Sequence, residues 1–106
     1  MQSNPLNHEE TKMRIETTNF GIVLIREQGD KALSHESTAT HHIRRLLNER
    51  DGGGWKRFYP NRHGLTDCRQ GVRNGNKLYW FSRYQIEEAH KAFNSGKVFF
   101  DYHNEP

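Results

Sequence analysis

The sequence holds little of what usually identifies a secreted or a membrane protein. Its one cysteine, Cys68, cannot form an internal disulfide, so the fold has to be stable without a covalent cross-link. No apolar run approaches the roughly 18 residues of a membrane-spanning helix, and the polar N-terminal segment lacks the apolar stretch of a signal peptide. We therefore expect a cytoplasmic protein that has no membrane partner.

Motifs that bind cofactors are also missing. The stretch DGGGWK at residues 51–56 is rich in glycine, but it lacks the G-x-x-x-x-G-K-[ST] spacing with which backbone amides surround a nucleotide phosphate. No paired carboxylates stand out as a general acid and base. We expect no bound cofactor, and an enzyme is the less favoured class.

The seven histidines raise the question of a metal site. Structural zinc sites use about four ligands in two closely spaced pairs. His63 and Cys68 form one loose pair, whereas the adjacent His41 and His42 point to different sides of a helix. We therefore expect no resident metal ion.

The composition is sufficient for one folded domain. The chain has 106 residues, which matches the typical domain of about 100–150 residues. Ile, Leu, Val and Phe make up only about a fifth of it, close to the level at which disorder becomes an alternative, but the formal net charge is only +3 and the apolar residues are gathered in runs. We expect residues 1–11 to be a flexible tail and residues 12–106 to be a single α+β domain with a small core.

Hydrophobic periodicity predicts a hairpin near the N-terminus. Residues 12–17 alternate between apolar and polar side chains, which is the two-residue period of a half-buried strand. Residues 20–27 are apolar on both faces, with Phe20, Ile22 and Leu24 sharing one face. A strand of this kind usually lies inside a sheet.

Two helices are predicted from apolar positions that recur on one stripe. The first, over residues 34–51, follows the N-cap Ser34 and ends at a run of three glycines. The second, over residues 82–95, opens with an S-x-x-Q capping box and ends at Gly96. The core-facing stripe of the first helix consists of Ala39, Ile43, Leu46 and Leu47.

Three further strands are predicted over residues 55–59, 77–81 and 97–102. The dipeptide Asn74-Gly75 favours a type I′ turn and so predicts an additional strand that pairs with 77–81. The resulting order is β-β-α-β-β-β-α-β, which predicts an α+β fold with one small, mainly antiparallel sheet packed against two helices. An exposed edge at the last strand would allow a dimer, so both monomer and dimer stay open.

Positive charge and aromatic residues concentrate in one third of the chain. Residues 52–84 hold seven Lys or Arg and one acid, whereas the remaining residues hold nine Lys or Arg and twelve acids. Seven of the twelve aromatic residues lie in the same segment. The residues expected in the core are Phe58, Leu78 and Trp80, and the aromatic residues expected to be exposed are Trp55, Tyr59 and Tyr79.

Cations that alternate with flat side chains indicate a nucleic-acid surface, because Lys and Arg contact phosphates while aromatic rings stack on bases. The outer face of the first helix adds two arginines. The sequence therefore predicts a non-enzymatic nucleic-acid-binding accessory or regulatory protein, for DNA or RNA, of the size and style encoded by phages and mobile elements. The predicted nucleic-acid-binding residues are Arg44, Arg45, Trp55, Lys56, Arg57, Tyr59, Arg62, His63, Arg69, Arg73, Lys77 and Tyr79.

Three other interpretations of the same residues remain open. The basic segment could bind an acidic surface on a host protein, which would make the protein an inhibitor or adaptor of a nucleic-acid-processing enzyme. A small metal-independent ribonuclease would use His63 as a general acid or base, flanked by Arg62 and Arg69. Finally, strands of a small sheet place large side chains inside and Lys or Arg outside without any binding function.

Overall fold

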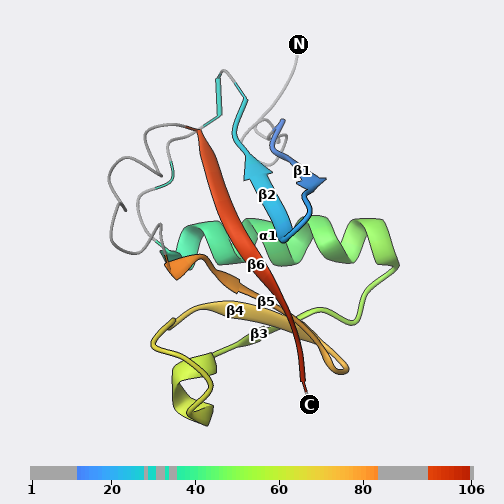
Figure 1. Cartoon of the computed structure of the whole chain (residues 1–106). Helices are drawn as coiled ribbons and strands as arrows, with labels where there is room; N and C mark the ends of the chain where they lie inside the picture. The colour runs from blue at the N-terminus through green and yellow to red at the C-terminus, as the bar shows by residue number, and fades with distance from the viewer. Residues whose placement is uncertain (1–11, 28, 31–32, 34–35, 84–95, 106) are drawn as a thin grey trace.

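Six antiparallel strands and one α-helix build the described part of the chain, which in this computed structural model comprises residues 12–27, 29–30, 33, 36–83 and 96–105. The elements in chain order are β1 (Arg14–Thr17), β2 (Gly21–Ile25), α1 (Glu36–Asp51), β3 (Lys56–Phe58), the 3₁₀ helix η2 (Pro60–His63), β4 (Gly71–Asn74), β5 (Lys77–Phe81) and β6 (Lys97–Asn104) (Figure 1). The predicted α+β class with an antiparallel sheet is confirmed. The second predicted helix, over residues 82–95, lies almost wholly outside the described residues.

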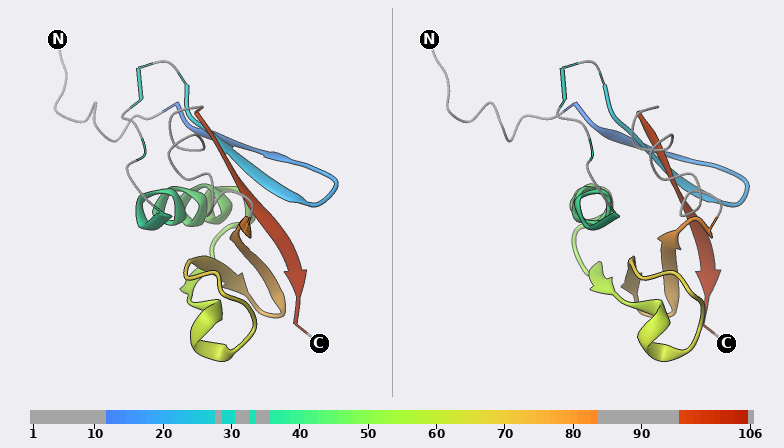
Figure 2. Two further views of the ribbon diagram at one scale, coloured as in Figure 1. Left: turned by 60° about the vertical axis from the view of Figure 1, so that its left-hand side comes forward. Right: turned by 90° about the vertical axis from the view of Figure 1, so that its left-hand side faces the viewer.

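The strands form one sheet in the order β1-β2-β6-β5-β4-β3, and every neighbouring pair is antiparallel. β6 therefore lies inside the sheet, so the expectation of an exposed edge at the last strand is wrong. The physical reason is that β2 is buried along its whole length and needs a neighbour on both sides, which β1 and β6 provide. The right-hand view of Figure 2 shows α1 end-on, on one side of the sheet.

The main core fills the space between α1 and the sheet. Successive strand residues point to opposite faces, so alternate residues of β2, β6 and β5 meet the apolar stripe of the helix. Phe81 and Phe100 pack edge to face with their ring centroids 5.9 Å apart. Each large apolar side chain that is fully buried contributes about 1.5–3 kcal/mol. The predicted helix stripe is confirmed, with Ala39, Ile43 and Leu47 buried and Leu46 packed against the core.

A smaller cluster lies on the opposite face of the sheet and consists of Phe58, Cys68, Leu78 and Trp80. Cys68 comes from the segment between η2 and β4, which passes over this face (Figure 2). The prediction that Phe58, Leu78 and Trp80 belong to the core is confirmed. Burial raises the pKa of the Cys68 thiol, which keeps it protonated and unreactive at neutral pH.

The β4–β5 hairpin turns one residue later than predicted. Asn74 pairs with Lys77, so the two loop residues are Gly75 and Asn76. Gly75 has a φ of 66°, and no described residue other than glycine has a positive φ. A glycine with positive φ at the first loop position is the pattern of a type II′ turn rather than type I′. Asn74 stays in the strand, where its side chain lies beside Gly54.

Gly21 allows the β1–β2 hairpin to approach β6. A Cβ at this position would lie 2.0 Å from the carbonyl oxygen of Phe100, so no side chain fits there. The turn before it is closed by Thr18, whose N–H donates to the Gly21 carbonyl at 2.8 Å and whose hydroxyl accepts the Gly21 N–H at 2.9 Å. The tip of the hairpin is thereby held against the centre of the sheet.

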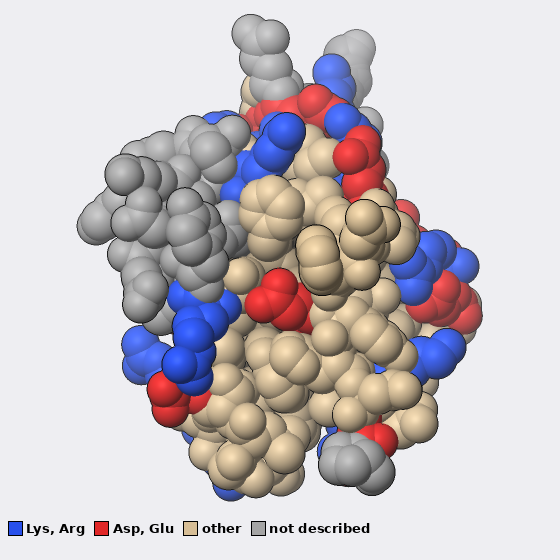
Figure 3. Space-filling view, in the orientation of Figure 1, with Lys and Arg blue, Asp and Glu red and all other residues tan. Residues whose placement is uncertain are grey.

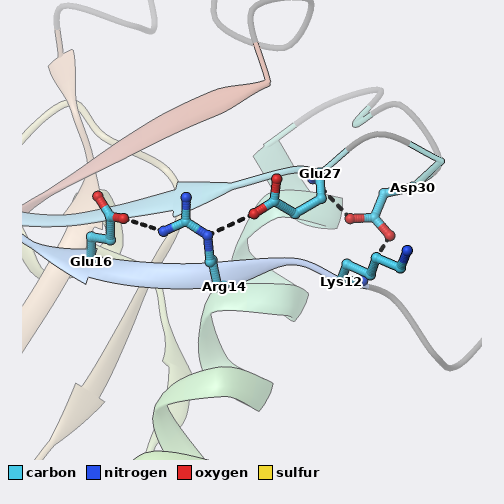
Figure 4. Close-up of polar contacts among 5 residues, drawn as sticks. All are labelled: Lys12, Arg14, Glu16, Glu27 and Asp30. Atoms are coloured by element: carbon cyan, nitrogen blue, oxygen red, sulfur yellow. Dashed lines mark hydrogen bonds and ion pairs between the residues drawn. The ribbon is translucent and has the colours of Figure 1, made fainter.

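Polar contacts tie the outer strand β1 to the loop that follows β2 (Figure 4). Arg14 donates from Nε to Oε2 of Glu27 at 2.6 Å and also pairs with Glu16. The carboxylate of Asp30 accepts the backbone N–H groups of Lys12 at 2.8 Å and of Glu27 at 3.0 Å. These contacts are exposed and add little stability, but charge on an edge strand discourages its pairing with another chain.

Asn48 connects the end of α1 to the start of β3. Its Oδ1 accepts the N–H of Trp55 at 2.8 Å, and its Nδ2 donates to the Trp55 carbonyl at 3.2 Å. Its own carbonyl accepts the N–H groups of Gly52 at 2.8 Å and Gly53 at 3.0 Å. The sequence places Asn48 on the exposed face of the helix, whereas the structure uses it as the link across the glycine loop.

Asn48→Ala is expected to lower the free energy of unfolding by about 1–3 kcal/mol, because two partly buried backbone groups of Trp55 lose their partner. Urea denaturation followed by circular dichroism measures the loss. The matched control is Asn61→Ala, an exposed asparagine of η2, which should change the value by less than about 0.5 kcal/mol. Equal losses in the two variants would contradict a specific role for the Asn48 side chain.

Candidate functional site

Two open hollows meet on the helix side of the sheet, between the β1–β2 tip and the C-terminal end of α1. Their volumes are about 450 and about 300 Å³, and both are walled by Tyr79 and Tyr102. Together we name them the aromatic groove. The remaining residues of the first hollow are Thr17, Thr18, Asn19, Phe20 and Gly21, and those of the second are Arg50, Asp51, Trp55, Asn74 and Lys77.

Four aromatic side chains line the groove, and the rings of three of them are in contact. The N–H of Tyr102 donates to the Phe20 carbonyl at 2.8 Å, and Tyr102 pairs with Tyr79 across β6 and β5. The ring centroids of Tyr102 and Tyr79 are 5.4 Å apart, and those of Tyr79 and Trp55 are 5.5 Å apart. Exposure falls from 81% at Phe20 through 41% at Tyr102 to 3% at Trp55. The groove therefore has an open end at Phe20 and a closed end at Trp55.

The closed end is organised around the carboxylate of Asp51. Its Oδ2 accepts the indole N–H of Trp55 at 2.7 Å, and Arg50 donates from Nε to Oδ1 at 2.8 Å and from Nη2 to Oδ2 at 3.0 Å. The hydrogen bonds from Arg50, and then from Trp55, lower the pKa of Asp51 from 3.8 to about 2. Lys77 adds a second cation, so Arg50 and Lys77 together exceed Asp51 by one positive charge.

Three of the predicted binding residues line the groove, namely Trp55, Lys77 and Tyr79. Lys77 is exposed and Tyr79 is half-buried. The expectation that Trp55 is exposed is wrong, since its side chain is 3% exposed. The reason lies in its contacts, because Asn48 holds its backbone and Asp51 accepts its indole N–H.

Two predicted arginines have partners within the fold. Arg57 is half-buried and donates to the hydroxyl of Ser37 at 3.1 Å and to its carbonyl at 2.9 Å, which ties β3 to α1. Arg73 pairs with Glu105, and its guanidinium carbon lies 5.4 Å from the ring centroid of Phe58. Neither arginine lines the groove.

The region around η2 holds five further predicted residues. The Arg62 guanidinium lies 4.4 Å above the ring of Tyr59, and the His63 ring stacks on Phe58 with the centroids 4.9 Å apart. His63 is the residue that the ribonuclease interpretation requires, and here its ring lies against the smaller core cluster. The two other predicted residues of this part of the chain, both exposed, are Lys56 and Arg69.

The remaining predicted residues, Arg44 and Arg45, lie half-buried on α1. Arg45 forms an i,i+4 ion pair with Glu49 at 3.0 Å. The structure brings neither of them into the aromatic groove. The face of the sheet away from α1 is mainly uncharged, with Lys and Arg at its rim (Figure 3). The cations of residues 52–84 are therefore distributed over several surfaces and do not form one patch.

Sequence reasoning missed three groove residues, namely Phe20, Tyr102 and Arg50. The apolar pattern assigns Phe20 to the same strand face as Ile22, but β2 begins at Gly21 and Phe20 belongs to the turn. The signal for Tyr102 was present, since alternation along β6 places it on the same face as the buried Phe100. Arg50 carried no local signal, because its position beside Lys77 depends on how α1 meets the sheet.

No family model, curated protein or solved structure matches this chain. Within the described ranges, no group of three or more His, Cys, Asp or Glu side chains gathers in a way that could hold a metal ion. Nor is any helix in that part of the chain long and apolar enough to cross a membrane. The groove is therefore interpreted from its own chemistry.

The contacts of Asp51 predict a loss of stability in acid. Its folded-state pKa of about 2 lies below the ordinary 3.8, so its contribution is present above a pH of about 4 and is lost as the pH falls towards about 2. The Asp51 side chain is 31% exposed, and screening by water reduces the contribution to about 1 kcal/mol. Asp51→Asn should be less stable than the wild type by this amount at neutral pH and equally stable near pH 2 (about the folded-state pKa).

Urea titrations of both proteins across this pH range measure the difference. Asp67→Asn is the matched control, because the Asp67 side chain is 89% exposed and pairs with Arg83 at the surface. The control should match the wild type at every pH. A difference between Asp51→Asn and the wild type that does not change with pH would contradict the assignment.

Proposed function

We propose that this protein is a non-enzymatic, nucleic-acid-binding accessory or regulatory protein that binds its ligand in the aromatic groove. The observation that carries the proposal is the row of rings from Phe20 through Tyr102 to Tyr79, which lies beside Arg50 and Lys77. Proteins that hold nucleic acid combine rings that stack on bases with cations that contact phosphates. The groove offers both within one hollowed surface.

The positive charge of the protein also favours an anionic ligand. The chain has a formal net charge of +3, and Arg50 and Lys77 leave the closed end of the groove with an excess of one positive charge over Asp51. Neutralising a phosphate releases counterions, so this part of the affinity falls with salt. Stacking on the open end is expected to depend less on salt.

The first test is a fluorescence-anisotropy titration of labelled DNA and RNA oligonucleotides, single- and double-stranded, at low and at physiological salt. Binding that weakens as salt increases supports the proposal. Absence of binding to every oligonucleotide at low salt would contradict it. The inhibitor or adaptor function directed at a host protein would then become the next hypothesis to examine.

Lys77→Ala is expected to weaken oligonucleotide binding and to reduce the slope of log affinity against log salt by about 0.7, the value for one phosphate contact on a single strand. Lys77 suits this test because its side chain is exposed at the groove. The same titrations at several salt concentrations give the slope.

Lys56→Ala is the matched control for this substitution. Lys56 is also an exposed lysine in a strand. In the β3–β4 register it lies opposite Arg73, so its side chain is on the face of the sheet away from the groove. It should leave the slope unchanged. Equal effects of the two substitutions would mean that binding follows overall charge and not the groove.

A further inference from the structure

Phe20 is the most exposed large apolar side chain in the described part of the chain, at 81%. Single exposed apolar residues are common on protein surfaces, so exposure by itself indicates no site. Two further observations distinguish Phe20. Its backbone is held in place, and its neighbours in the first hollow include two tyrosines.

The backbone of Phe20 is hydrogen bonded on both sides. Its N–H donates to the hydroxyl of Thr18 at 3.1 Å, and its carbonyl accepts the N–H of Tyr102 at 2.8 Å. Gly21, the next residue, lies so close to Phe100 that no side chain fits between them. The turn therefore fixes the backbone that carries the phenyl ring without burying the ring, so little backbone order has to be created on binding.

The first hollow has aromatic walls and a polar lining. The Phe20 carbonyl accepts the N–H of Tyr102 at 2.8 Å, so the two residues lie side by side at the end of the β2–β6 pairing. The rest of the lining adds two hydroxyls and one amide, from Thr17, Thr18 and Asn19. A flat ring with polar edges suits such a site, because its faces can stack while its edges form hydrogen bonds.

We propose that this hollow holds one unpaired nucleobase, stacked on Phe20 beside Tyr102, and that the ligand is therefore a single-stranded nucleic acid. We name it the base slot, and the inference rests on the proposed function. In a duplex, neighbouring base pairs cover the faces of each base. A phenyl ring at the surface stacks most readily on a base whose face is free, as in a single strand or in a base turned out of the duplex.

The second hollow suits the phosphate that adjoins this base. Tyr79 and Tyr102 wall both hollows, so the base slot lies next to the cations Arg50 and Lys77. The negative charge of Asp51 at this end is already compensated by its hydrogen bonds from Arg50. The groove thus offers a site for a base and a site for a phosphate in succession, which matches the repeating unit of a nucleic-acid strand.

Phe20→Ala tests the base slot. The affinity for a labelled single-stranded oligonucleotide should fall about 5- to 150-fold, which is the range for the loss of one stacked base. The salt slope should stay unchanged, because no charge is removed. Phe20→Leu, which keeps an apolar side chain but no ring, should lose affinity as well.

Leu65→Ala is the matched control, because Leu65 is an exposed apolar residue, at 44%, in the segment between η2 and β4. It should leave the affinity within about twofold of the wild type. Thermal unfolding of all three variants checks that the fold is intact. A fourth variant, Phe20→Trp, provides a readout other than affinity, since a base stacked on the new indole should quench its fluorescence and a matching duplex should not.

The outcomes separate the base slot from the proposed function. Tighter binding of the single strand than of the duplex, together with the loss in Phe20→Ala, supports the slot. Equal binding of both, or an unaltered affinity in Phe20→Ala when Lys77→Ala weakens binding, overturns the slot and leaves the proposed function standing. Absence of binding to any oligonucleotide at low salt overturns both.

Discussion

The pairing of β6 between β2 and β5 is the interaction on which the rest of this structure depends. The β1–β2 hairpin and the three strands β3, β4 and β5 come from different parts of the chain, and β6 joins them along both of its edges. Gly21 permits the close approach on one side. The same pairing creates the groove, because Tyr102 of β6 is the residue that lies between Phe20 and Tyr79. Without β6 there would be neither a continuous core nor a continuous row of rings.

The alternation of side chains between the two faces of a strand explains why the basic and aromatic residues of 52–84 do not gather on one surface. Neighbouring residues in a strand point to opposite faces, so a dense run of cations is divided between them. Arg57 is drawn towards α1 by Ser37, whereas Arg73 lies on the other face beside Phe58. Lys77, the first residue of β5, is the cation of the β4–β5 hairpin that lines the groove. The density of residue types in a segment therefore says less about a site than the face on which each one lies.

The two ends of the groove differ in what their side chains do: those at the closed end stabilise the fold, and the ring at the open end is exposed to solvent. At the closed end, Asn48, Asp51 and Arg50 hold Trp55 through hydrogen bonds that belong to the fold. At the open end, Phe20 contributes almost no burial, although its backbone is fixed. For the proposed ligand, the backbone beneath these rings is fixed before binding, which favours affinity because little order has to be created. The proposed contact residue Phe20 is also separate from the core, since its ring is 81% exposed.

The sequence by itself determined the α+β class, the antiparallel strands, the buried stripe of α1 and the core positions of Phe58 and Trp80, because each of these follows from a period of two or of 3.6 residues within a short window. It also selected Lys77 and Tyr79, which line the groove. Only the tertiary structure decided that Trp55 is buried, that β6 is central and that Phe20 stands exposed beside Tyr102. The physical reason is that these features rest on hydrogen bonds and contacts between distant segments of the chain, and no local pattern of residues records which strands become neighbours.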